Sequence, residues 1–161
     1  MRGPSYNPLG GIPSGSLYCK AWAPRCLVRK PRASGGDMNT IAWLMLIAAV
    51  LPFVAAAVSK AGGKGYDNNN PRSWLARQEG WRARADAAQT NLFEGLPFFF
   101  AAVLFALYQM ADATALASLM GAWILLRLVY LGIYLAGYGM VRTLVWTVAL
   151  AVNIAILFLG S

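Results

Sequence analysis

The sequence predicts an all-α membrane protein, a bundle of four transmembrane helices. Hydrophobic residues make up 58% of the chain and charged residues 12%, whereas soluble domains average about 45–50% and about 25%. The first apolar run, 41–58, is uninterrupted and is long enough to cross a hydrocarbon core of about 30 Å. With three further apolar runs, we expect spans at about 41–58, 81–108, 113–138 and 142–159.

A soluble four-helix bundle is the alternative fold. Each helix of such a bundle keeps a charged stripe toward water. The last apolar run, 144–159, contains no charged side chain, and Thr147 and Asn153 are its polar residues. The membrane interpretation is therefore favoured.

Residues 1–37 differ in composition from the rest of the chain. They are rich in Gly, Pro and Ser and hold six basic residues against one acidic residue, whereas residues 38–161 hold eight against five. Acid-poor, basic segments of this kind are typical of targeting peptides. The alternative is a start codon assigned too early, with Met38 as the true first residue. We expect disorder in 1–37 in either case.

The distribution of basic residues predicts the orientation in the membrane. The first loop and the start of the second span contain six of them, whereas Asp112 is the charged residue between the second and third spans. The positive-inside rule then places the first loop in the cytoplasm and both termini outside. Because the basic tail would have to cross the membrane, we favour Met38 as the start. The six basic residues are Lys60, Lys64, Arg72, Arg77, Arg82 and Arg84.

Proline and turn-forming residues mark the limits of the elements. Pro52 lies inside the first span, where it removes one backbone hydrogen bond. The loop that follows is built from turn formers, and Pro71 is placed to open a short segment or a helix. We expect the second span to begin near 74–81 as an amphipathic helix at the membrane surface, and the glycines of the AGYGM stretch to form the last turn.

Polar side chains follow one face of the second span and one face of the third. Within each set the spacing is three, four or seven residues, which at about 3.6 residues per turn gives a single stripe. Counting about 1.5 Å per residue from the outer connection places Glu94 and Arg127 at about the same depth, so the stripes can face each other. The sets are Arg77, Arg84, Asn91 and Glu94 on the second span and Arg127, Tyr130, Tyr134 and Tyr138 on the third.

These stripes have two interpretations. A charge inside the bilayer is costly and is by default a sign of a functional site. The alternative is a buried Arg127–Glu94 pair that only fixes helix packing, with the tyrosines as packing or interface residues. Pro97 frees the carbonyl of Phe93 beside the stripe, where it can bend the helix and open a pocket.

The chain contains no histidine, which argues against histidine general bases and against Ser-His-Asp and Cys-His nucleophile systems. Cys19 and Cys26 have neither metal-site spacing nor histidine partners. We therefore expect no metal, and we expect no nucleic acid partner.

The stretch RADAAQTNLFEGLP contains an Asn-x-x-Glu-x-x-Pro core at Asn91, Glu94 and Pro97, and RLVYLGIY adds an Arg-x-x-Tyr-x-x-x-Tyr pattern on the next span. Together these motifs resemble the MAPEG family, membrane-associated proteins in eicosanoid and glutathione metabolism. The loop YDNNNPR and the turn YLAGYGMVRTLVW resemble its bacterial branch. The resemblance covers about residues 40–160 and implies a location in a bacterial inner membrane.

The resemblance implies a homotrimer of four-helix subunits with glutathione bound between neighbouring subunits, near the cytoplasmic side. Bidentate arginines suit the carboxylates of glutathione, and Glu94 suits its amine. Arg142, at the start of the fourth span, is implied to stabilise the glutathione thiolate, which needs no histidine to act as a nucleophile. The implied glutathione-binding residues are Arg84, Asn91, Glu94, Arg127, Tyr130 and Tyr134.

Two positions depart from the family pattern. Ala87 stands where eicosanoid-processing members commonly carry an arginine. Without this arginine, the expected affinity for glutathione is lower. Arg142 aligns with the catalytic arginine only if the preceding turn shifts by one residue. Eicosanoid synthesis is therefore not expected.

Three functions fit these observations. The leading one is a glutathione transferase or peroxidase that acts on hydrophobic electrophiles entering from the membrane lipid. A MAPEG-fold scaffold or ligand sensor without catalysis is the second, and Ala87 supports it. A small multidrug or cation transporter is the third. It would need Glu94 without a fixed cationic partner, and the nearby arginines favour an anionic ligand instead.

Overall fold

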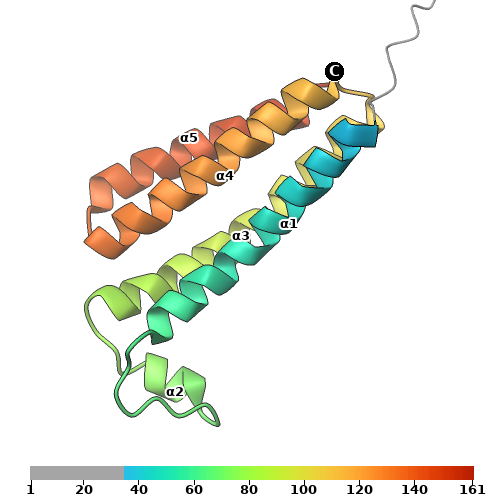
Figure 1. The fold of residues 1–161 in the computed structure, drawn as a ribbon. Coiled ribbons are helices and arrows are strands. Elements are labelled where there is room, and N and C mark those ends of the chain that lie inside the picture. The colour runs from blue at the N-terminus through green and yellow to red at the C-terminus, as the bar shows by residue number, and fades with distance from the viewer. Residues whose placement is uncertain (1–34) are drawn as a thin grey trace, which may run out of the picture. The chain divides into compact units, whose positions relative to one another are not determined.

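The computed structural model describes residues 35–161, and the expectations for the tail up to residue 34, its two cysteines included, lie outside this range. The described chain forms five helices and no strand: α1 (Gly35–Lys60), α2 (Pro71–Leu75), α3 (Trp81–Tyr108), α4 (Ala113–Ala136) and α5 (Gly139–Leu157) (Figure 1). Four of them, α1, α3, α4 and α5, are long and apolar enough to cross a membrane. The prediction of an all-α bundle of four spanning helices is confirmed.

The four long helices pack in two pairs, α1 with α3 and α4 with α5. Helix α1 lies along α3 and also contacts α4, and α5 lies along α4 and also contacts α3 (Figure 1). The C-terminus lies beside the connection between α3 and α4, where Gly160 packs against Gln109. This arrangement leaves α3, α4 and α5 in mutual contact around one interior region.

Two apolar clusters fill the interior at different depths. The larger one occupies the half of the bundle that contains the α3–α4 connection, and there the rings of Phe99 and Trp123 stack with centroids 4.0 Å apart. The smaller one lies nearer the first loop and contains Ala55, Ala88, Leu92 and Leu131. Along α3 and α4, the residues between the two clusters include the polar motif positions.

The outward faces of the long helices carry large apolar side chains. Trp43 on α1 and Leu144 on α5 are each 65% exposed, and Leu125 on α4 is 62% exposed. In water such surfaces would favour aggregation, whereas the hydrocarbon of a bilayer accommodates them. The exposed faces therefore agree with helices that span a membrane.

The first loop is packed around one tryptophan and is joined to the start of α3 by one arginine. Trp74 of α2 is buried, its indole nitrogen donates a hydrogen bond to the carbonyl of Lys64, and its ring meets Tyr66 edge-on at 5.2 Å. Arg82 at the start of α3 donates to the carbonyl of Ala61 across 3.0 Å. These contacts fix the loop on the end of the bundle.

Two residues assigned to the polar stripes lie outside the helices that the stripes follow. The second span is expected to begin near 74–81, and α3 begins at Trp81, directly after Gly80 with its φ of 63°, so Arg77 belongs to the connection before α3. Helix α4 ends at Ala136 because Gly137 adopts a left-handed φ of 89°, a conformation that glycine favours. Tyr138 therefore precedes α5 instead of extending the α4 stripe, and Arg142 lies within the first turn of α5.

Candidate functional site

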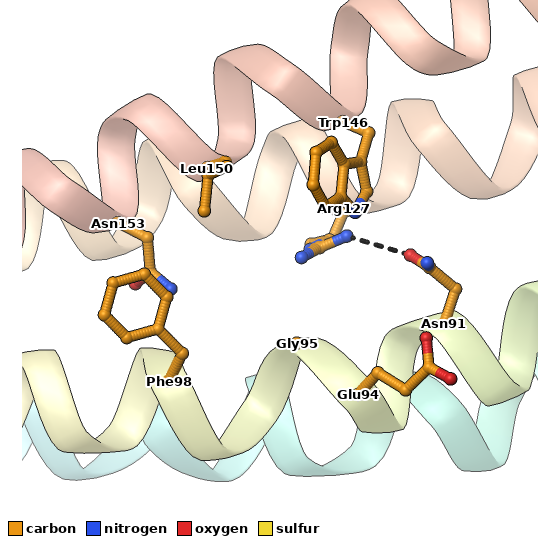
Figure 2. Close-up of a pocket in the computed structure, with 8 residues that line it drawn as sticks. All are labelled: Asn91, Glu94, Gly95, Phe98, Arg127, Trp146, Leu150 and Asn153. Carbon is orange, nitrogen blue, oxygen red and sulfur yellow. Dashed lines mark hydrogen bonds between the residues drawn. The ribbon is translucent and has the colours of Figure 1, made fainter.

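Two adjoining cavities lie among α3, α4 and α5. We call the larger one, about 200 Å³, the turn-side cavity because it lies near the α4–α5 turn, and the other, about 160 Å³, the deep cavity. Asn91 and Trp146 line both of them. The turn-side cavity is also lined by Tyr130, Tyr134, Arg142 and Thr143. The deep cavity is also lined by Glu94, Gly95, Phe98, Arg127, Leu150 and Asn153 (Figure 2).

Arg127 is the buried cation of the deep cavity. It is 4% exposed and extends from α4 toward α3, where its Nη1 donates a hydrogen bond of 3.3 Å to Oδ1 of Asn91 (Figure 2). Its guanidinium carbon lies 4.9 Å from the ring centroid of Trp123 and 5.8 Å from that of Tyr130. Such contacts with ring faces stabilise a cation. The Nε of Arg127 is buried and has no hydrogen-bond partner within the described chain.

Glu94 lines the same cavity, but it is not the partner of Arg127. Its side chain is exposed, and within residues 35–161 its carboxylate forms no ion pair. The alternative of a buried Arg127–Glu94 pair is therefore wrong. Asn91 and Gly95 are four positions apart and lie along one line of α3. The guanidinium lies against this line, whereas Glu94 is displaced to one side of it.

Aromatic rings and one arginine form the wall of the turn-side cavity. Tyr130 is 3% exposed, and its ring meets that of Tyr134 edge-on with centroids 5.5 Å apart. The guanidinium carbon of Arg142 lies 4.4 Å from the centroid of the Tyr134 ring. Tyr134 thus holds Arg142 at the cavity by a cation–π contact.

Arg84 lies apart from the other predicted site residues. Its Nε donates a hydrogen bond of 2.9 Å to the carbonyl of Leu135, and it lines neither of the two cavities. Leu135 belongs to the last turn of α4, whose carbonyls have no partner inside the helix. In the described chain Arg84 joins the start of α3 to the end of α4.

The structure adds cavity residues that the motifs did not identify. They are Gly95, Phe98, Thr143, Trp146, Leu150 and Asn153. Four positions on α5, Arg142, Trp146, Leu150 and Asn153, step by four, four and three and so share one helix face. The spacing is visible in the sequence, where Asn153 is a polar residue in an apolar run.

The lack of a side chain at Gly95 makes room for Arg127. A Cβ built on Gly95 would lie 2.5 Å from Nη2 of Arg127. We expect Gly95→Ala to displace the guanidinium from Asn91 and to weaken the binding of an anionic ligand about tenfold. The measurement is calorimetric titration with glutathione. Gly121→Ala is the control, because a Cβ at Gly121 meets nothing within 4 Å. Equal affinities for the two variants would contradict the role given to Gly95.

Four helices long and apolar enough to span a membrane, with a cavity lined by both charged and apolar side chains, define an integral membrane protein with a candidate site inside its bundle. The model of the MAPEG family matches residues 40–160, and the chain belongs to this family. Members of the family generally act with glutathione and form trimers in membranes. Comparison with curated proteins and with solved structures gave no match.

Proposed function

We propose that the protein is a trimeric membrane glutathione transferase or peroxidase, with glutathione as co-substrate and hydrophobic electrophiles from the bilayer as second substrates. The observation that carries this proposal is the pair of adjoining cavities, which present arginines, a carboxylate and hydrogen-bonding tyrosines inside a membrane bundle. Glutathione carries two carboxylates, an amine and a thiol, so it needs groups of both charges.

The cavity residues divide these tasks. Arg127 is suited to a carboxylate because a guanidinium offers a rigid fork of donors. Glu94 is suited to the amine, and Asn91, Tyr130 and Tyr134 can hydrogen-bond to the peptide groups. Arg84 can contribute through the guanidinium nitrogens that do not bond Leu135. Arg142, held against Tyr134, is placed to stabilise a thiolate.

The chemistry then follows from the thiolate. In conjugation, the sulfur forms a bond to an electrophilic carbon and the leaving group departs with its electron pair. In reduction of a hydroperoxide, the sulfur attacks the terminal oxygen and an alkoxide leaves and takes up a proton. A second glutathione then converts the resulting sulfenic acid to the disulfide and water. Neither route needs a histidine or a metal.

The proposed orientation places glutathione and the electrophile on different access routes. We assign the basic first loop to the cytoplasmic side of a bacterial inner membrane. Glutathione in the cytoplasm can then reach the turn-side cavity. The electrophile reaches the site laterally through the lipid, along the exposed apolar faces of the helices.

A scaffold or ligand sensor of the same fold is the second candidate. Ala87 supports it, because no arginine stands at that position, and so does the use of Arg84 in joining α3 to α4. A transporter is less favoured. A transporter would require a glutamate without a fixed cationic partner, and Glu94 has no ion pair in the described chain. However, Arg127 and Arg142 on the cavity walls favour an anionic ligand over a cationic one.

Arg142→Ala tests the enzymatic proposal. We expect this variant to bind glutathione but to lose the ultraviolet absorbance of bound thiolate. Its conjugation of 1-chloro-2,4-dinitrobenzene should fall about 100-fold, as when one electrostatic stabiliser is removed from other enzymes. Reduction of cumene hydroperoxide is the parallel assay. Arg77→Ala, an exposed arginine outside the long helices, is the control. An unchanged thiolate signal would show that Arg142 does not stabilise the thiolate and is only a surface residue in the first turn of α5.

A further inference from the structure

The guanidinium of Arg127 has one edge without a hydrogen bond. Its Nη1 donates to Oδ1 of Asn91, and its Nη2 lies against Gly95. Its carbon lies 4.9 Å from the centroid of the Trp123 ring. The Nε is buried and has no acceptor within residues 35–161. A buried donor on a charged group inside a membrane bundle is costly unless it is paired.

Asn153 presents the complementary group to the same cavity. It lies on α5, it is 2% exposed, and its Oδ1 is a buried acceptor without a donor in the described chain. Figure 2 shows Arg127 between Asn91 on one side and Asn153 on the other. Buried amide oxygens are normally paired. One unpaired donor and one unpaired acceptor at one cavity require a group that both accepts and donates.

Water is the smallest molecule that meets this requirement. The cavity volume of about 160 Å³ corresponds to about five water molecules at about 30 Å³ each. Buried water is held where it finds at least two polar partners. Phe98 and Leu150, which also line the cavity, offer no competing hydrogen bond. An anion would satisfy the Nε of Arg127 but not the oxygen of Asn153, and a cation would do the reverse.

We propose that one bound water, or a chain of two, links Nε of Arg127 to Oδ1 of Asn153, and that Asn153 is a positioning residue for Arg127. The water accepts from Nε and donates to Oδ1. This bridge fixes the rotation of the guanidinium and leaves the unbonded N–H groups of its two terminal nitrogens for a ligand carboxylate. The water site does not depend on the proposed function, whereas its effect on glutathione affinity does.

A double-mutant cycle tests the link between the two side chains. Glutathione affinity is measured by calorimetry for wild type, Asn153→Leu, Arg127→Lys and the double variant. Leucine keeps the bulk of asparagine but removes the acceptor, so we expect Asn153→Leu to bind glutathione about fivefold more weakly. Lysine carries all its donors on one terminal nitrogen and has no separate Nε–H. In the Arg127→Lys protein we therefore expect the leucine substitution to change the affinity by less than about twofold.

Two further variants separate the bridge from packing. Asn153→Ser keeps an oxygen acceptor and leaves room for one more water, so we expect it to recover most of the affinity that Asn153→Leu loses. Thr147→Val is the matched control on α5, because the Thr147 hydroxyl bonds the carbonyl of Thr143 and the residue lines neither cavity. It should bind glutathione as wild type does.

Three results of these titrations overturn the positioning role. Equal losses from Asn153→Leu in the wild-type and Arg127→Lys proteins would show that Asn153 acts independently of Arg127. No loss in the wild-type protein would show that Asn153 does not affect the ligand. No recovery in Asn153→Ser would show that the effect comes from packing alone. In each of these cases the proposed function stands, because wild type binds glutathione.

An experimental map of the wild-type protein that resolves ordered water tests the bridge without glutathione. We expect density within hydrogen-bond distance of both Nε of Arg127 and Oδ1 of Asn153, or two linked peaks between them. A direct bond between the two side chains, or a gap without water, overturns the inference. If wild type binds no glutathione, the proposed function fails, and this map still decides whether the water site exists.

Discussion

Arg127→Ala is expected to reduce glutathione affinity about 100-fold or more. Arg127 is the buried cation of the deep cavity, and its removal leaves a ligand carboxylate without a counter-charge inside the membrane. The variant also leaves Oδ1 of Asn91 without its donor, so we expect lower thermal stability as well. Calorimetric titration and thermal unfolding in detergent measure the two effects separately.

Arg127→Lys separates charge from geometry. Lysine keeps the positive charge but lacks the fork that can bond Asn91 and a carboxylate together. We expect this variant to bind glutathione more tightly than Arg127→Ala and more weakly than wild type. Wild-type affinity in a correctly assembled Arg127→Ala protein would reject the assignment of the deep cavity as the glutathione site.

Phe99→Ala is expected to have the largest effect on stability. Phe99 is fully buried and stacks on Trp123 in the larger apolar cluster. Replacing a buried phenylalanine with alanine leaves a cavity and lowers the free energy of unfolding of soluble proteins by about 3–5 kcal/mol. In a membrane the lost packing contacts remain the main term, because helix association there depends on van der Waals packing. Thermal unfolding in detergent should show a large decrease in the midpoint.

Phe105→Ala is the matched control for this variant. Phe105 lies on the same helix but is exposed, so lipid or detergent replaces its contacts. We expect a small change in its unfolding midpoint. The Trp123 ring, which Phe99 supports, also faces the Arg127 guanidinium, so Phe99→Ala should weaken glutathione binding in addition. Equal midpoints for the two variants would show that the stack does not stabilise the bundle.

The apolar runs allowed the fold to be predicted because each spanning helix must satisfy its own backbone hydrogen bonds within the bilayer. Helix ends were harder to predict, because they depend on single glycines. Gly80 and Gly137 adopt positive φ, and these conformations removed Arg77 from α3 and Tyr138 from α4. A spacing argument assumes an unbroken helix and cannot detect such breaks.

The candidate site was predicted in its motif residues but not in its contacts. Helical periodicity brought Asn91, Glu94 and Arg127 to one interface, and all three line the deep cavity. Which of them bonds Arg127 depends on how the helices are rotated, and Asn91 takes this place instead of Glu94. Asn153 was not predicted because α5 carries no family motif at that position, although its spacing from Arg142 places both on one face.

The most direct test of the account is titration of the detergent-purified wild-type protein with glutathione by calorimetry, with the ultraviolet absorbance of thiolate recorded on the same samples. The account predicts saturable binding accompanied by a thiolate signal at neutral pH, because Arg127 and Glu94 hold the ligand and Arg142 stabilises the ionised sulfur. Binding without thiolate would indicate a ligand sensor. Absence of binding would contradict the central claim and would leave the polar cavities as structural features of a membrane scaffold.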